Sequence, residues 1–248
     1  MFLESMDVLP DMPAFSLKTD FAERRATRNA MCSAGLTLDL VYPFTLASRT
    51  VVNNFEPLLE TAAWVGARLA NVLVYDADPA RRLDNLCLLG ELAARYSIGL
   101  SIEFYPASRL RTIAEATALI DQVGRSDIGL TLDLLHWMRA GERTDKRQKG
   151  VRIAQICDGP ATMEPELREW EASHERLLPG DGAFDIADFI ASLPENCPLT
   201  LEVPRHKSLH AGTSALERAE QAYRAMRKTL GGPLVGNFDR IAEPQAHD

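Results

Sequence analysis

Short apolar runs alternate with helical patterns along this chain. The runs are rich in Leu, Ile and Val, as expected for parallel strands covered on both faces. They lie at 35–44, 71–76, 99–106, 128–134, 151–158 and 198–203. Apolar positions at helical spacing lie between and after them, at 54–70, 79–96, 110–124, 164–173, 185–193 and 213–230. The alternation predicts a parallel sheet with helices packed on it.

Repeated β/α units in a chain of 248 residues favour a (β/α)₈ TIM barrel. MFLESMD at 1–7 is a candidate further strand, followed by a helix over 20–34. A complete barrel needs eight strands, so the fold expected is a TIM barrel of α/β class that lacks its first β/α unit. A misassigned start, an open barrel or completion by a partner are alternatives. Residues 1–230 are expected to form one domain, and 231–248, rich in Gly, Pro and charge, a C-terminal extension.

Four of the predicted strands carry a polar side chain near their C-terminal ends. These residues are Glu103, Asp133, Gln155 and Glu202. Burying three carboxylates is costly unless a cation compensates them, and a divalent metal ion would do so. The all-oxygen set favours Mg²⁺ or Mn²⁺, with Co²⁺ or Zn²⁺ as alternatives. Active sites of TIM barrels lie at this end of the strands.

Composition and charge argue against nucleic acid and membranes as binding partners. The net charge of -8 argues against nucleic acid. No apolar run is long enough to span a bilayer, so no membrane partner is expected. The cysteines form no CxxC pair, and the first residues have no secretory pattern. A cytoplasmic protein with reduced thiols is therefore expected.

Four motifs, TLDLLHW, AQICD, ERLLPGDG and LTLEVP, carry a resemblance to a known family. They resemble the xylose isomerase-like TIM-barrel superfamily, and within it the sugar phosphate isomerase/epimerase group. The resemblance covers roughly residues 1–230.

The resemblance implies roles for six residues. Glu103 and Glu202 would both hold the metal and move protons between neighbouring carbons. Asp133 and Gln155 would complete the metal shell. His136 and Arg176 would bind the substrate, because they match the DxxH histidine and the arginine that precedes the PGxG turn; a second metal is an alternative partner for the histidine.

The function implied is a metal-dependent isomerase or epimerase that acts on a sugar or related hydroxy-ketone through an enediolate. Many sugar epimerases of the family have His where this chain has Gln155. Glutamine there resembles lyases that dehydrate cyclic hydroxy-ketones, such as dehydroshikimate dehydratases; an inosose dehydratase is the related alternative. A non-catalytic truncated barrel is a third reading. An abasic-site nuclease is a poor fit, because it needs a histidine-rich three-metal cluster.

Two further expectations concern the edges of the fold. An open barrel exposes unpaired backbone, which favours a homodimer. His206 and His210 follow the last predicted strand and are expected in a solvated loop.

Overall fold

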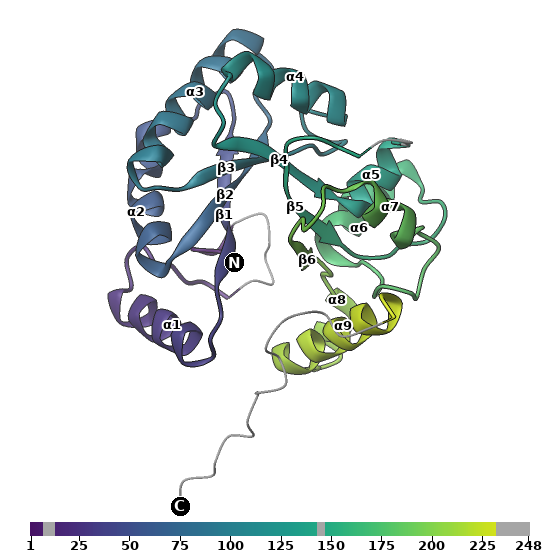
Figure 1. Ribbon diagram of the computed structural model, residues 1–248. Coiled ribbons are helices and arrows are strands. Elements are labelled where there is room, and N and C mark those ends of the chain that lie inside the picture. The colour runs from purple at the N-terminus through teal and green to yellow at the C-terminus, as the bar shows by residue number, and fades with distance from the viewer. Residues whose placement is uncertain (7–12, 143–146, 232–248) are drawn as a thin grey trace, which may run out of the picture.

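The structure, a computed structural model, describes residues 1–6, 13–142 and 147–231. Its centre is a six-stranded parallel sheet in the order β1-β2-β3-β4-β5-β6. The strands are β1 (Leu38–Leu46), β2 (Ala67–Val74), β3 (Gly99–Glu103), β4 (Ile128–Asp133), β5 (Val151–Ile156) and β6 (Leu199–Leu201). The sheet curls like part of a barrel wall (Figure 1). The predicted fold class is confirmed, with a sheet consistent with a truncated barrel.

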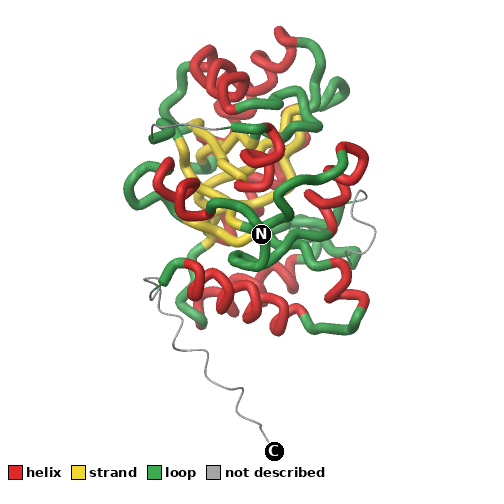
Figure 2. Tube along the Cα trace, turned by 90° about the vertical axis from the view of Figure 1, so that its right-hand side faces the viewer, coloured by secondary structure: helices red, strands yellow, loops and turns green. Residues whose placement is uncertain are grey.

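Helices lie outside the curled sheet, and Figure 2 shows the yellow strands enclosed by them. The α-helices are α1 (Phe21–Ser33), α2 (Glu56–Val65), α3 (Pro79–Arg95), α4 (Ile113–Val123), α5 (Leu134–Ala140), α6 (Arg168–His174), α7 (Ile186–Ser192), α8 (His206–His210) and α9 (Ala215–Thr229). Two 3₁₀ turns, η1 (Val52–Phe55) and η2 (Pro165–Leu167), precede α2 and α6.

Local capping sets several boundaries. Asp78 caps the first turn of α3 by accepting from Arg81 N, and Thr112 caps α4 by accepting from Glu115 N. Gly66 ends α2 in the left-handed conformation with φ 85°. The helix predicted over 54–70 was therefore wrong at its end, because residues after Gly66 pass directly into β2.

The core lies between the sheet and its helices. Every residue of β4 is buried, and apolar side chains such as Ile102, Leu130 and Ile156 are at most 2% exposed. This burial on both faces explains why the strands are apolar runs without alternation.

The N-terminal residues lie along the free edge of β1. Phe2 forms a parallel bridge with Tyr42, and Leu3 N donates to Tyr42 O over 2.8 Å. The expected seventh strand is thus an isolated bridge, and α1 follows near its predicted place. The sheet ends at β6 on the other side, and the homodimer expected from an open edge stays a prediction.

Residues 232–248, most of the predicted C-terminal extension, lie outside the described residues. Among the described helices, none combines the length and apolar character that crossing a membrane requires.

Candidate active site

The parallel register brings the four polar strand-end residues together. Glu103 ends β3 and Asp133 ends β4, while Asp133 pairs with Gln155 of β5, and Glu202 follows β6 directly. Glu103, Asp133 and Gln155 are each at most 4% exposed. These residues share one end of the sheet, the end at which barrel enzymes place their active sites.

Glu103, Asp133 and His136 form a compact buried group. One ligand atom from each lies within 4.8 Å of the others. His136 Nε2 is 3.2 Å from Glu103 Oε1, and His136 Nδ1 is 3.9 Å from Asp133 Oδ1. Burial alone would lower the pKa of His136, but the two carboxylates outweigh it and raise that pKa above its ordinary value.

The DxxH spacing has a local structural cause. Asp133 is the N-cap of α5, where its Oδ1 accepts a hydrogen bond from His136 N over 3.0 Å. This cap turns the chain from β4 into the helix and directs the imidazole toward Glu103. The sequence prediction continued the strand to 134, so α5 was missed.

Arg176 lies between two of the carboxylates. Its Nη1 donates to Asp133 Oδ2 over 2.6 Å, and its Nη2 donates to Glu202 Oε1 over 3.4 Å. Burial opposes ionisation of Asp133, yet Arg176 and His136 hold the pKa of Asp133 below its usual value. Burial also opposes the charge on Arg176, but the carboxylates raise its pKa well above the ordinary value. Protein cations therefore compensate part of the charge that the sequence analysis assigned to a metal.

Gln155 connects Glu202, which follows β6, to Tyr42 of β1 at the other edge of the curled sheet. Its Nε2 donates to Glu202 Oε2 and, over 2.6 Å, to the Tyr42 hydroxyl. Burial, followed by the nearby carboxylates Glu103 and Asp133, raises the pKa of Glu202 to about 7, although Arg176 opposes the rise. Glu202 can therefore exchange a proton near neutral pH.

A chain of hydrogen-bonded polar side chains supports Glu103, and its members are not among the site residues predicted from the sequence. Asn71 Nδ2 donates to Glu103 Oε2 over 2.5 Å, and Asn71 Oδ1 accepts from Thr131 Oγ1 over 2.7 Å. Thr131 also bonds Ser101 over 2.6 Å. Asn71 is 1% exposed in the middle of β2, so an amide inside an apolar strand was the signal that could have identified it.

A cavity of about 1010 Å³ opens over these residues. Glu103, His136, Gln155, Arg176 and Glu202 all contribute to its wall. Its further polar lining includes Tyr42, Asn71, Tyr75, Tyr105 and Glu169. This volume is sufficient for a small polyhydroxylated ligand.

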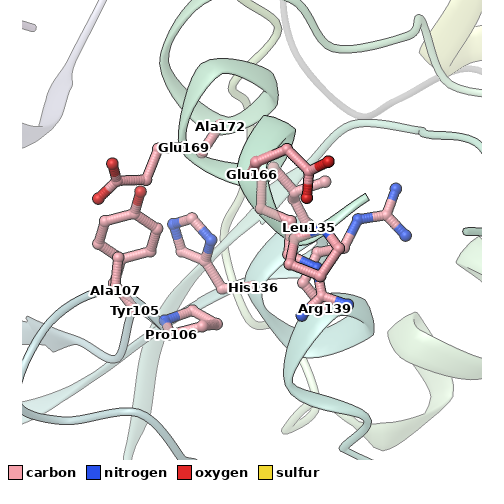
Figure 3. A pocket seen from close by; sticks show the side chains of 11 residues that line it. Tyr105, Pro106, Ala107, Leu135, His136, Arg139, Glu166, Glu169 and Ala172 are labelled. Carbon is pink, nitrogen blue, oxygen red and sulfur yellow. The ribbon is translucent and has the colours of Figure 1, made fainter. Parts of the chain in front are cut away.

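A smaller hollow of about 330 Å³ adjoins the cavity. The ring of Tyr105 lies beside the imidazole of His136, with ring centres 4.5 Å apart (Figure 3). Glu169 of α6 lies on the other side of Tyr105 in the same view. Burial, followed by nearby Tyr75, raises the pKa of Tyr105 to about 12, so its hydroxyl stays a hydrogen-bond donor at neutral pH.

The donor set fits a divalent metal ion. Gln155 Oε1 is buried and has no hydrogen-bond partner within the described part of the chain, and such an acceptor is suited to a cation or a ligand hydroxyl. It complements the group of Glu103, Asp133 and His136. His136, assigned to substrate from the sequence, thus lies among the groups that can hold a metal.

The chain belongs to the xylose isomerase-like TIM barrel family, whose model matches residues 4–229. The resemblance seen in the sequence motifs is therefore confirmed.

Curated relatives include isomerases and a dehydratase. An inosose isomerase of Bacillus velezensis is 24% identical over 161 residues, which are 59% of this chain and 56% of the relative. A 3-dehydroshikimate dehydratase of Pseudomonas aeruginosa is 30% identical over 134 residues, 51% of this chain and 21% of the relative. The chain thus spans about half the length of the inosose isomerase and a smaller part of the dehydratase.

Solved structures share the fold. The IolI protein with a bound zinc atom superposes with a TM-score of 0.70 at 17% identity, covering 93% of this chain and 88% of that one. A xylose isomerase domain protein of Salmonella typhimurium gives a TM-score of 0.73 at 22% identity, with 92% and 86% covered. At these identities the likeness shows the fold alone.

Proposed function

We propose that this chain is a divalent-metal-dependent isomerase or epimerase that acts on a sugar or related hydroxy-ketone. The observation that carries the proposal is that Glu103 and Glu202 line one cavity, and that Glu103 belongs there to a buried group, with Asp133 and His136, that can hold a metal ion. The known relatives, an inosose isomerase among them, support this class of reaction.

Glu103 and Glu202 are proposed as the acid and base. One glutamate removes the proton from the carbon beside the substrate carbonyl, which gives an enediolate, and the other returns a proton to the opposite face or to the neighbouring carbon. Asn71 and His136 contact different oxygens of Glu103 and fix its orientation. In the metal-free protein the pKa of Glu202 is raised to about 7, and a bound dication would lower it and favour the carboxylate that acts as base.

The proposed metal ligands are Glu103, Asp133, Gln155 and Glu202, with His136 added by the geometry. When bound, the ion would polarise the carbonyl and hydroxyl oxygens of the substrate. Mg²⁺ or Mn²⁺ suits the oxygen set, and the imidazole also suits Co²⁺ or Zn²⁺. Arg176 and the tyrosine hydroxyls are proposed to bind substrate oxygens.

Dehydration of a cyclic hydroxy-ketone is the second candidate. Gln155 favours it, as does the identity of 30% to a 3-dehydroshikimate dehydratase. The first proton transfer is the same, but the enediolate then loses the hydroxyl on the next carbon as water, with a glutamate as the acid.

Proton exchange tests both candidates. Metal-free protein is reloaded separately with Mg²⁺, Mn²⁺, Co²⁺ and Zn²⁺ and incubated in D₂O with inososes, ketohexoses and 3-dehydroshikimate. Deuterium at the carbon beside the carbonyl, followed by NMR, reports proton removal. A new ketose or epimer then indicates isomerisation. Loss of water, seen as a product 18 Da lighter by mass spectrometry, indicates dehydration.

Matched variants test whether Glu103 and Glu202 carry out the proton transfer. Glu103→Gln and Glu202→Gln should each abolish exchange while the fold is retained by circular dichroism. Glu195→Gln changes an exposed glutamate, 78% accessible, and should leave exchange unaltered. Folded wild-type protein that takes up no metal and exchanges no proton would favour a non-catalytic barrel.

A further inference from the structure

The side-chain amide of Gln155 is held at its nitrogen by two oxygen atoms. Nε2 donates one hydrogen to the Tyr42 hydroxyl, over 2.6 Å, and the other to Glu202 Oε2. An amide nitrogen has two hydrogens, so both are in use. Oε1 of the same amide is buried and has no hydrogen-bond partner within residues 1–6, 13–142 and 147–231. The amide therefore presents its oxygen, and not its nitrogen, as the open atom.

The two partners of the amide differ in how they fix it. A carboxylate only accepts hydrogen bonds, whereas a phenolic hydroxyl can donate or accept. The carboxylate of Glu202 thus selects the nitrogen side of the amide, but a single hydrogen bond would leave the planar group free to pivot. The Tyr42 hydroxyl supplies the second contact, and two contacts at the nitrogen set the direction of Oε1.

Tyr42 is itself anchored by backbone and ring contacts. Its N donates to Met1 O over 3.0 Å, and its O accepts from Leu3 N over 2.8 Å. The ring of Phe2 lies against the phenol ring, with ring centres 5.2 Å apart. The hydroxyl that reaches Gln155 is therefore carried by a side chain that is already held in place.

The contact between Tyr42 and Gln155 crosses the interior of the curled sheet. Tyr42 belongs to β1 and Gln155 to β5, and these strands are not neighbours in the sheet. The pairing of β1 with β2 shifts register between Val41 and Phe44, and such irregularities beside active sites re-aim a side chain. Thus β1 departs from regular pairing at the residue whose hydroxyl reaches across the cavity wall to Gln155.

We propose that Tyr42 is a positioning residue of the metal site and holds the amide of Gln155 so that Oε1 is presented to the ion. This inference rests on the proposed function, in which Gln155 is a metal ligand. Groups that hydrogen-bond a metal ligand fix its orientation, and their loss typically weakens metal binding by about 10–100-fold. Tyr42 needs no contact with the ion for this role, because it acts through Gln155.

NMR of the metal-free, full-length protein tests the positioning directly. The proton–nitrogen correlation signals of the Gln155 side-chain amide are assigned by their absence from Gln155→Leu. In Tyr42→Phe, which keeps the ring, one amide hydrogen loses its acceptor. Its signal should move upfield and its exchange with solvent should become faster. Unchanged Gln155 signals in Tyr42→Phe that is folded by circular dichroism would overturn the proposal.

Tyr96→Phe is the matched control. It also removes one tyrosine hydroxyl, which bonds Glu56 Oε1 over 3.1 Å, and neither residue belongs to the cavity wall. The Gln155 signals should therefore stay as in the wild type.

The affinity for Mn²⁺, measured by calorimetric titration of the metal-free protein, reports the consequence for the metal site. Tyr42→Phe should weaken Mn²⁺ binding by on the order of 10-fold, whereas Tyr96→Phe should bind as the wild type does. In a Gln155→Leu background no amide is left to position, so Tyr42→Phe should cause no further loss. A loss of the same size in both backgrounds would overturn the proposal, since Tyr42 would then act independently of Gln155.

The same titrations separate this inference from the proposed function. Wild-type protein that binds no divalent ion would overturn the proposed function together with this role of Tyr42. Wild-type Mn²⁺ affinity in folded Tyr42→Phe would overturn the role of Tyr42 alone.

Discussion

Arg176 donates a hydrogen bond from Nη1 to Asp133 Oδ2 over 2.6 Å, and both side chains are almost fully buried, at 2% and 0% exposure. The sequence shows three carboxylates that need a compensating charge, and this ion pair supplies part of it from within the chain. Before Asp133 can give both oxygens to a metal ion, the arginine has to release it. Arg176 also lines the cavity, where it is proposed to bind a substrate oxygen.

Replacing Arg176 by Met should destabilise the metal-free protein by about 3–5 kcal/mol, because Asp133 is left as a buried charge without its main partner. Urea denaturation in the presence of a chelator measures the loss. Arg147→Met is the control, since its ion pair with Glu195 is exposed and should contribute about 1 kcal/mol or less. Equal losses in the two variants would contradict the assigned role of Arg176.

Glu202 should make the stability of the metal-free protein depend on pH. The pKa of its carboxyl is raised from 4.5 to about 7 in the folded state, so folding favours the protonated form. Its contribution is fully present below the unfolded pKa and is lost as the pH rises from about 4.5 to about 7. Glu202→Gln removes this titration.

The measurement is the free energy of unfolding of wild type and Glu202→Gln at several pH values. The difference should grow in favour of the variant between pH 4.5 and 7 and then level off. A constant difference over this interval would contradict the raised pKa of Glu202.

Much of the fold could be predicted because each β/α unit is locally encoded. The helix over 79–96 is closely matched by Pro79–Arg95, where an Asp cap and a proline start the helix. The predicted boundaries of helices and strands were wrong where contacts between distant parts of the chain decide them. Residues 67–70 look helical in sequence, yet pairing with β1 makes them strand, and the short helix α8 depends on contacts with Glu175.

The candidate site was predictable in its residues but not in its pairings. Glu103, Asp133 and Glu202 could be identified because each is a carboxylate in an apolar strand segment. Burying a carboxylate costs free energy unless a cation or hydrogen bonds compensate it. The sequence did not show that Arg176 bonds Asp133, since the two are 43 positions apart. Nor did it show Asn71 behind Glu103, because the contact joins residues of two neighbouring strands.

Asn71→Ala should impair both stability and turnover. The change removes a donor from Glu103 and an acceptor from Thr131, which leaves buried polar atoms unpaired and costs about 1–3 kcal/mol. The released carboxylate should lower proton exchange by on the order of 10-fold. Asn53→Ala, at an exposed position, is the control for both measurements. Wild-type exchange in folded Asn71→Ala would show that Glu103 needs no such support.

Asp158 organises the PGDG turn that the sequence motif marks. Its buried carboxylate accepts from three backbone groups, Gly159 N at 2.8 Å, Gly180 N at 2.9 Å and Phe184 N at 3.0 Å. Gly182 packs so closely that an added Cβ would lie 2.2 Å from Asp158 Oδ1. The turn therefore needs both the carboxylate of Asp158, two residues after β5, and a glycine at position 182.

Asp158→Ala should therefore cost at least about 4 kcal/mol, because hydrogen bonds to a charged group are worth roughly 1.5–3 kcal/mol each and three backbone donors lose their acceptor. Asp181→Ala lies in the same turn but is exposed, so its effect should stay within about 0.5 kcal/mol. Urea denaturation of both variants makes the comparison. A variant with wild-type stability would mean that the turn is held by its backbone alone.

The same turn leads from Arg176 into α7. Asp158→Ala should therefore also weaken metal-dependent proton exchange, measured at temperatures where the variant is still folded.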